Sequence, residues 1–283
     1  MPKDTIHTVR RGDTLGKIAK KYGHASWKTI YDAPENAKFR KNRPDPNAIQ
    51  PGDKITIPPS AGSVVGRYFK NMPRMSISID APKALIFVQQ KWQYVFVEKD
   101  ATVSKWTSKE KTKFHNDADK IIWKRWSGKF KITCAGTSDF ARVYKDTVFN
   151  TNFDIKRVTS SGHWTVTVTK VPAGSKSPQS SINWGTQVVN LDSEDMAKRD
   201  LRGTGKDKDK FDPVAHEFGH TAGNSKFGPA ARGDEYPAGH ANFLDKASIM
   251  NIGNQVRKRH ADHLILMLNK MIKDTTWSVK SVG

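Results

Sequence analysis

The sequence predicts an α+β protein of two units, a small βααβ module followed by a larger domain that combines strands with helices. Three observations predict this class. The 283 residues suffice for one small and one ordinary domain. Apolar residues alternate in some segments and recur at helical spacing in others. A cluster of structure-breaking residues at 59–63 reads as a linker between units at 7–58 and 64–283.

Composition narrows the class of protein. An apolar share of 36%, with eight Trp and thirteen Phe, supplies enough bulky side chains for packed cores, which excludes wholesale disorder. The net charge of +20 favours encounter with anionic walls and other polyanions. Because the basic residues are scattered and form no recognised binding motif, we expect no specific nucleic-acid partner.

We recognise no targeting signal in the sequence. Residues 1–11 lack the apolar run of a signal peptide, and no segment approaches the ~20 apolar residues of a membrane span. We therefore expect no transmembrane segment and a route other than an ordinary signal if the protein works outside the cytoplasm. The single cysteine, Cys134, is expected to be a small buried hydrophobe without a disulfide.

The first unit reads as strand, helix, helix, strand. Residues 6–9 predict a strand, after which Asp13 or Thr14 can cap a helix that ends at Gly23. Ser26 can cap a second helix, and a longer polar segment follows. Residues 54–58 alternate as the closing strand should.

The two ends of this unit, residues 8–15 and 49–58, resemble the LysM family. The resemblance implies binding of peptidoglycan or another glycan that contains N-acetylglucosamine. It assigns the groove to two loops, with these candidate residues: Gly12, Asp13, Thr14, Asn47, Ile49 and Pro51. The middle segment, 32–47, resembles longer variants of phage and contractile-injection proteins, in which the domain can serve assembly instead.

The second unit is expected to begin with strands and a long helix. Residues 84–98 are rich in apolar and aromatic side chains and predict a strand pair, and residues 107–126 predict an amphipathic helix. Residues 163–169 alternate as a half-buried strand does. The Lys- and Asp-rich run at 203–210 predicts an exposed loop.

The motif that carries chemistry is His216-Glu217-Phe218-Gly219-His220. Asp212 is a candidate N-cap and Pro213 suits the first helical position, so both histidines are expected on one helix. Residues four apart share a helix face, so the two imidazoles can bind one Zn²⁺, while Glu217 stands beside them as a general base. Two surface histidines that frame a glutamate by chance are the alternative interpretation.

The downstream sequence resembles the metzincin-like zinc peptidases. Gly223 lies three residues after His220, and Ser248-Ile249-Met250-Asn251 matches the family's Met-turn, which carries over to Met250. The resemblance implies a zincin-like fold for residues 64–283 and a zinc metalloendopeptidase, a hydrolase. A third histidine would stand at position 226, which is Lys226 and cannot serve.

The third ligand therefore comes from elsewhere. Asp234-Glu235-Tyr236 resembles bacterial relatives in which an aspartate replaces that histidine, so Asp234 is the first choice, with Glu235 and His240 as alternatives. Side-chain donors for the developing oxyanion are Tyr236, His260 or His263, although the two histidines also suit a polar helix face.

Together the two units predict a zinc-dependent peptidase anchored to peptidoglycan, because tethering raises the local concentration of substrate. It would act in the periplasm or outside the cell as a secreted antibacterial effector or toxin. A secretion apparatus and an immunity protein are the partners that this interpretation implies. The alternatives are a peptidoglycan cross-link endopeptidase or amidase, and a structural protein of a phage or injection apparatus with a vestigial zinc site.

Overall fold

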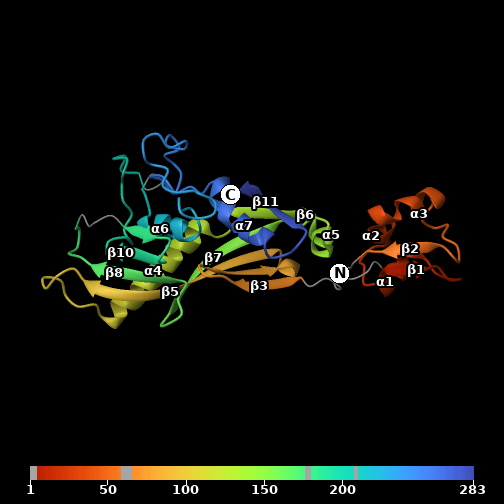
Figure 1. The fold of residues 1–283 in the computed structure, drawn as a ribbon, viewed down its shortest axis with the longest axis horizontal. Coiled ribbons are helices and arrows are strands. Elements are labelled where there is room, and N and C mark those ends of the chain that lie inside the picture. The colour runs from red at the N-terminus through yellow and green to blue at the C-terminus, as the bar shows by residue number, and fades with distance from the viewer. Residues whose placement is uncertain (1–4, 59–65, 176–179, 207–209) are drawn as a thin grey trace. The chain divides into compact units, whose positions relative to one another are not determined.

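The computed structural model describes residues 5–58, 66–175, 180–206 and 210–283 (Figure 1). Contacts within the chain divide it into two compact units. One unit comprises Met1–Gly66 with Ala135–Lys145, and the other comprises Arg67–Cys134 with Asp146–Gly283. The predicted linker at 59–63 lies outside the described residues.

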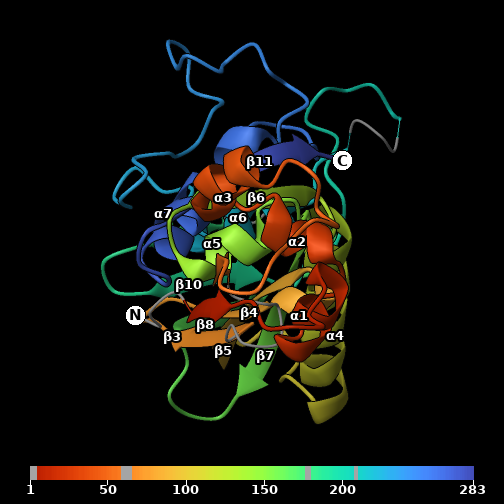
Figure 2. The same cartoon turned by 90° about the vertical axis from the view of Figure 1, so that its right-hand side faces the viewer.

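The first unit is a two-stranded sheet covered by short helices, drawn in red to orange in Figure 2. Its elements are β1 (Thr5–Thr8), α1 (Leu15–Lys21), α2 (Trp27–Tyr31), η1 (Pro34–Asn36), α3 (Ala37–Asn42) and β2 (Lys54–Ile57). The strands are antiparallel, with Thr5 opposite Ile57. Helix α5 (Asp139–Tyr144) is grouped with this unit by its contacts.

The ends of the first two helices follow the predicted chemistry. The Thr14 hydroxyl accepts from the Lys17 backbone N–H at 3.2 Å, and the Ser26 hydroxyl accepts from that of Lys28 at 3.3 Å. Gly23, with φ +74°, ends α1. Between helices and sheet lies one apolar core: Val9, Leu15, Ile18, Ala19, Ile30, Tyr31, Ile55 and Ile57.

Helix α3 corrects the predicted βααβ order, in which residues 32–47 were a polar segment. Its helical pattern is weak because Phe39 alone packs inward, edge-on against Tyr31. What holds the segment are polar side chains: Arg40 donates to the Tyr31 and Ala33 carbonyls at the end of α2. Asn36 binds main-chain groups of β2. Such contacts between distant segments leave no periodicity in the sequence.

The second unit is a mixed sheet with strand order β11-β6-β7-β5-β8-β10-β9, and β4 and β3 form a hairpin beside β5. The strands are β3 (Arg67–Asn71), β4 (Ser76–Asp80), β5 (Leu85–Glu98), β6 (Phe130–Gly136), β7 (Phe149–Val158), β8 (Trp164–Lys170), β9 (Ser181–Asn183), β10 (Val188–Asp192) and β11 (Thr275–Val282). Strand β8 confirms the alternation predicted at 163–169.

The predicted strand pair at 84–98 is a single 14-residue strand, β5. One edge of β5 pairs in parallel with β7, while the other is shared by β4 along residues 85–89 and by β8 along 92–98. Because two partners use different halves of that edge, a long apolar strand arises where the composition suggested two short ones.

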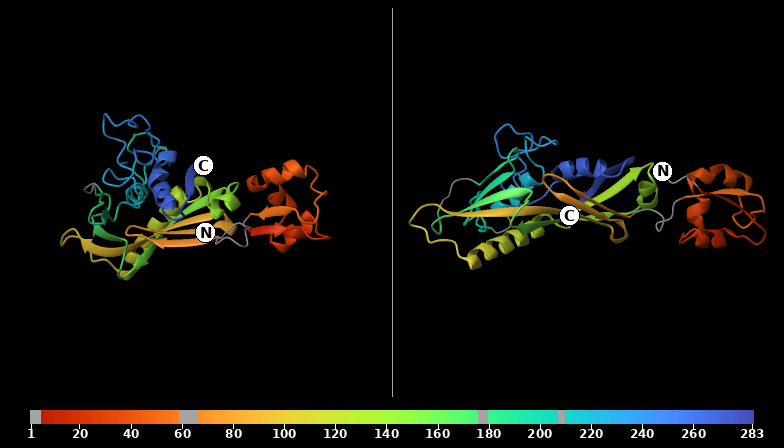
Figure 3. Two further views of the ribbon diagram at one scale, coloured as in Figure 1. Left: turned by 45° about the vertical axis from the view of Figure 1, so that its right-hand side comes forward. Right: turned by 60° about the horizontal axis from the view of Figure 1, so that its bottom comes forward.

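Helix α4 (Ser108–Trp126) matches the predicted helix and begins with a capping box between Thr107 and Glu110. It packs on β7 and on α6 (Pro213–Thr221). Figure 3 shows this helix, in yellow, beside the sheet. The remaining helical elements are η2 (Ala81–Lys83), η4 (Lys258–Ala261) and α7 (Asp262–Asn269).

Two further expectations concern single segments. Cys134 is buried at 4% exposure, and burial raises the pKa of its thiol to about 11. Residues 203–206 of the predicted loop are exposed, and 207–209 lie outside the described residues. Across the part of the chain that the structure describes, no helix combines the length and apolar character that a membrane crossing requires.

Candidate metal centre

Helix α6 carries the motif and is buried along its whole length. Asp212 is at its N-cap position and Pro213 is its first residue, as predicted. The Asp212 side chain, however, makes no cap hydrogen bond and instead pairs with Arg125 of α4. The next residue of α4 also contacts this helix, since the Trp126 indole N–H donates to the Ala215 carbonyl at 2.9 Å. The helix is therefore fixed by side chains of α4 rather than by its own cap.

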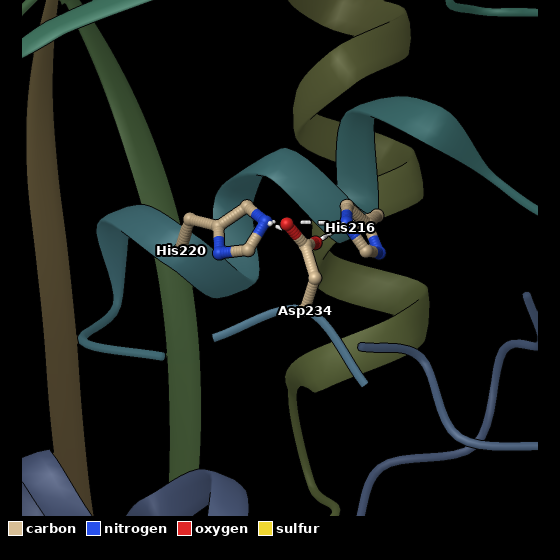
Figure 4. Close-up of side chains that lie close together, drawn as sticks. All are labelled: His216, His220 and Asp234. Atoms are coloured by element: carbon tan, nitrogen blue, oxygen red, sulfur yellow. Dashed lines mark hydrogen bonds and ion pairs between the residues drawn. The ribbon is translucent and has the colours of Figure 1, made fainter. Parts of the chain in front are cut away.

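The two histidines of α6 meet a carboxylate from a facing loop (Figure 4). The Nε2 atoms of His216 and His220 lie 3.2 Å apart, and each lies 3.0 Å from Oδ1 of Asp234. Both imidazoles are buried, and the Asp234 side chain is 35% exposed. The opposing effects of burial and of hydrogen bonds to the histidines leave the pKa of Asp234 well below its ordinary value.

The hydrogen bonds of the Nδ1 atoms determine which atoms of the two imidazoles face Asp234. Nδ1 of His216 is 2.7 Å from the Ile249 carbonyl, and Nδ1 of His220 is 2.7 Å from the Asn224 carbonyl. A carbonyl only accepts, so Nδ1 is the donor in each ring, and Nε2 is the atom that remains to bind a metal ion. The two Nε2 atoms and the Asp234 carboxylate therefore converge on one point, an arrangement that a metal cation can occupy in place of the protons.

These separations fit zinc. Nitrogen and carboxylate ligands bind Zn²⁺ at ~2.0–2.2 Å. Three atoms separated by 3.0 to 3.2 Å have a common point at that distance from each of them. Two imidazoles and one carboxylate are also a ligand set typical of catalytic zinc, which keeps a fourth position open. Among the described residues, this is the group of three potential ligands that is compact enough to hold a metal ion.

Glu217 lies between the two histidines in sequence and lines the adjoining cavity. Its side chain is 6% exposed, and its Oε2 is buried without a hydrogen-bond partner among the described residues. A buried carboxylate oxygen without a partner is costly unless it serves a ligand or a reacting group. The position suits a general base beside the metal.

Glu235 was an alternative third ligand, and the structure gives it a different role. Arg259 donates to both of its carboxylate oxygens, at 2.6 and 2.7 Å. The His260 ring lies 3.3 Å from the same carboxylate, and the Glu235 backbone N–H donates to the Met250 carbonyl at 2.7 Å. Glu235 therefore anchors the loop, which leaves Asp234 directed at the histidines.

Met250 lies beneath the helix, where the Met-turn was predicted. It is 1% exposed and packs against Gly219 so closely that a Cβ on this glycine would lie 2.4 Å from the Met250 sulfur. The glycine that follows the motif, Gly223, has φ +113°, and a Cβ there would lie 2.2 Å from Cβ of His263. Both glycines are thus required by close approach of neighbouring segments.

A cavity of about 530 Å³ opens beside the three-residue group. Its walls include Glu217, His220, Asp234, Tyr236 and His240. His240, the other alternative ligand, does not join the group, since its Nδ1 accepts from the Asn242 backbone N–H at 3.1 Å. Tyr236 remains a candidate donor, with its ring centroid 6.2 Å from that of His216.

His260 and His263 do not line this cavity. His260 is buried between Glu235 and Ser248, with both contacts at 3.3 Å, and burial lowers its pKa. The prediction that His260 acts at the oxyanion is thus not supported by its position, which is that of a supporting residue. Sequence reasoning missed the wall formed by Ser180, Ser181 and Ile182, because β9 is too short to leave a pattern.

The predicted glycan groove also has a definite geometry in the first unit. The β1–α1 loop and the loop before β2 lie side by side, because Val9 exchanges main-chain hydrogen bonds with Gly52 and Asp53. Asp13 is used internally, through Arg10 and His7, and Ile49 packs on the core. Four of the predicted residues are exposed on these loops: Gly12, Thr14, Asn47 and Pro51.

Comparison with known proteins identifies the first unit. The family model described as the LysM domain matches residues 7–58, which form a LysM domain. The chain is 33% identical over 95 residues to the "SpoIVD-associated factor A" of Bacillus subtilis (strain 168). That match covers 28% of this chain and 23% of the relative, so the chain spans about a quarter of the relative's length. No solved structure matches. The LysM domain indicates association with peptidoglycan or a related glycan of the cell wall.

Proposed function

We propose that the second unit is a zinc-dependent metallopeptidase that hydrolyses peptide bonds at the bacterial cell wall. The observation that carries the proposal is the convergence of His216, His220 and Asp234, with both imidazoles oriented through Nδ1 by backbone carbonyls. Two histidines that frame a glutamate by chance have no reason to be buried or to show this orientation. Catalytic zinc sites do, because it directs Nε2 to the metal.

The metal ion and the side chains have different roles in the proposed reaction. When bound, zinc supplies Lewis-acid chemistry, which lowers the pKa of water and polarises a carbonyl oxygen. Glu217 accepts the proton from the attacking water through its unpaired Oε2 and returns it to the leaving amine. The Tyr236 hydroxyl, in the wall of the same cavity, donates to the oxyanion of the substrate.

Strand β9 supports an extended peptide as the substrate. It pairs with β10 through Ser181–Asn183 and lies at the end of the sheet order, while Ser181 and Ile182 line the catalytic cavity. An extended chain can add to such an edge by main-chain hydrogen bonds, which bind peptides with little regard to side chains. This favours endopeptidase activity on protein-type peptide bonds.

The LysM domain favours a substrate at the wall, either envelope proteins or the peptide stems and cross-links of peptidoglycan. Delivery as an antibacterial effector, with a cognate immunity protein, belongs to the same proposal. A peptidoglycan amidase or cross-link endopeptidase is the second candidate, because the domain that binds the glycan would bring those bonds to the cavity.

The test is metal content by elemental analysis together with cleavage assays on an unfolded protein and on purified peptidoglycan. We expect wild type and Glu217→Gln each to hold about one zinc, Asp234→Ala to lose it, and wild type alone to cleave. Asp117→Ala, an aspartate of an exposed ion pair on α4, is the matched control and should behave as wild type.

The outcomes separate the candidates. Cleavage of the unfolded protein supports the endopeptidase, whereas release of stem peptides from peptidoglycan alone supports the second candidate. If the purified protein holds no zinc and cleaves neither substrate, the proposal of enzymatic activity is overturned. A LysM-bearing structural protein of a phage or injection apparatus then becomes the leading account.

A further inference from the structure

A second cavity, of about 370 Å³, adjoins the catalytic one. It lies between the β3–β4 turn, the loop after α6 and helix α7. The two cavities share the exposed side chain of Phe227, and Trp184 of the second cavity directly follows strand β9 of the first. A peptide bound along β9 therefore passes from one cavity toward the other.

The walls of the second cavity are apolar apart from two side chains. The apolar side chains include Met72, Met75, Trp184, Phe227, Pro229 and Met267. Into the same cavity project Arg74, from the β3–β4 turn, and His263, from α7. A cavity with this composition accepts an apolar group that carries a single polar end.

Arg74 is held in place but not neutralised. Its guanidinium lies over the Trp184 ring, 4.5 Å from the centroid, and Nη2 donates to the Trp184 carbonyl at 2.8 Å. Its Nε is buried without a hydrogen-bond partner, and no carboxylate among the described residues pairs with it. Burial lowers the pKa of Arg74, yet guanidinium stays charged at neutral pH. A partly buried cation without a counter-ion is unfavourable until an anion joins it.

His263 also has a buried polar atom without a hydrogen-bond partner among the described residues. Its side chain is 6% exposed, and its Nδ1 is buried without a partner among the described residues. Burial and the nearby Arg74 lower its pKa to about 4, so the imidazole is neutral at pH 7 and can donate one hydrogen bond. Two unpaired polar groups in one apolar cavity indicate that its ligand carries acceptor oxygens.

We propose that this second cavity binds a carboxylate of the peptide substrate, with Arg74 as the anchor. The inference rests on the peptidase activity proposed above and specifies its substrate class. One fixed positive charge among apolar walls balances one negative charge, and the planar guanidinium edge matches a carboxylate. The carboxylate is either that of an acidic side chain or that of a free C-terminus.

The experiment measures peptide binding to the Glu217→Gln protein, which is not expected to cleave its ligand, by calorimetry. The probes are octapeptides of neutral residues, acetylated and amidated, with glutamate moved through each position. Further probes are the all-glutamine peptide and the same neutral peptide with a free C-terminus. We expect at least one carboxylate peptide to bind about tenfold to a hundredfold more tightly than the neutral one. The peptide that binds more tightly shows whether the carboxylate belongs to an acidic side chain or to a free C-terminus.

Variants assign the preference to Arg74. Arg74→Met, in the Glu217→Gln background, should bind the carboxylate peptides no more tightly than the neutral peptide. Arg74→Lys, which keeps the charge without the planar edge, should retain part of it. Arg67→Met is the matched control, because Arg67 lies on the neighbouring strand with its side chain 74% exposed.

Two results would overturn the inference: equal binding of all probes to the Glu217→Gln protein, or a preference that survives in Arg74→Met. The first result needs no Arg74 variant, so it stands even where such a variant fails to fold. Because binding is measured without turnover, loss of the preference is distinguishable from absence of peptidase activity in wild type.

Discussion

Replacing Gly219 with alanine tests whether Met250 and Trp126 pack against helix α6 at this glycine. Gly219 lies inside α6, where intrinsic helix propensity favours alanine by ~1 kcal/mol. Packing acts in the opposite direction. The added Cβ would lie 2.4 Å from Sδ of Met250 and 2.8 Å from Cζ2 of Trp126. Propensity and packing therefore predict opposite signs for the change in stability.

The structure sets the expected magnitude. Trp126 is fully buried and its indole N–H is committed to the Ala215 carbonyl, so the ring cannot withdraw without loss of that bond. Overpacking of a core costs ~1–3 kcal/mol, and two contacts this short indicate the upper end. After the propensity gain, we expect a net loss of ~2 kcal/mol in the free energy of unfolding. For a unit of this size, the melting temperature falls by ~4–8 °C.

Thermal and urea unfolding of Gly219→Ala measure the effect. Gly16→Ala is the matched control, because Gly16 is a helical glycine with only the Thr14 hydroxyl near its added Cβ, at 3.9 Å. It should leave stability unchanged or raise it by up to ~1 kcal/mol. In a Met250→Ala background, Gly219→Ala should be less harmful. A Gly219→Ala protein as stable as wild type would refute the packing of these segments.

Further predictions concern other parts of the chain. Hydrogen bonds from Arg257 hold the pKa of Asp245 at about 2, so its stabilisation is present above pH ~4 and is lost as the pH falls toward 2. In urea unfolding, Asp245→Asn should cost about 1 kcal/mol at pH 7 and progressively less in that acid range. The buried thiol of Cys134 should resist thiol reagents at pH 8 until denaturant exposes it. Arg40→Ala should destabilise the LysM domain by ~1–3 kcal/mol in the same assay, because two carbonyls at the end of α2 lose their donor.

Local patterns predicted the parts of the fold that depend on neighbours in sequence. The caps at Thr14, one of the two candidates for the first helix, and at Ser26 involve residues two or three apart, and both form. The convergence of His216 with His220 is local for the same reason, since four residues make one turn of helix.

What the sequence did not reveal depends on distant contacts. Strand β5 is one strand because β4 and β8 share its edge, and no feature within residues 85–98 records that arrangement. Helix α3 is held by Arg40 and Asn36 across the domain, and Asp212 pairs with Arg125 from another helix instead of capping its own. In each case the partner lies elsewhere in the chain, a neighbouring strand for β5 and another segment for the polar side chains, which composition and periodicity do not encode.

The pair Asp234-Glu235 shows why adjacent carboxylates are hard to assign from sequence. Zinc binds the carboxylate of aspartate and that of glutamate, so residue chemistry alone left both residues as candidate third ligands. The structure separates them by their partners: Glu235 is 3% exposed and ion-paired to Arg259, with its backbone N–H bound to Met250. These contacts fix the loop against the Met-turn. Asp234, one residue earlier, instead contacts the Nε2 atoms of both histidines.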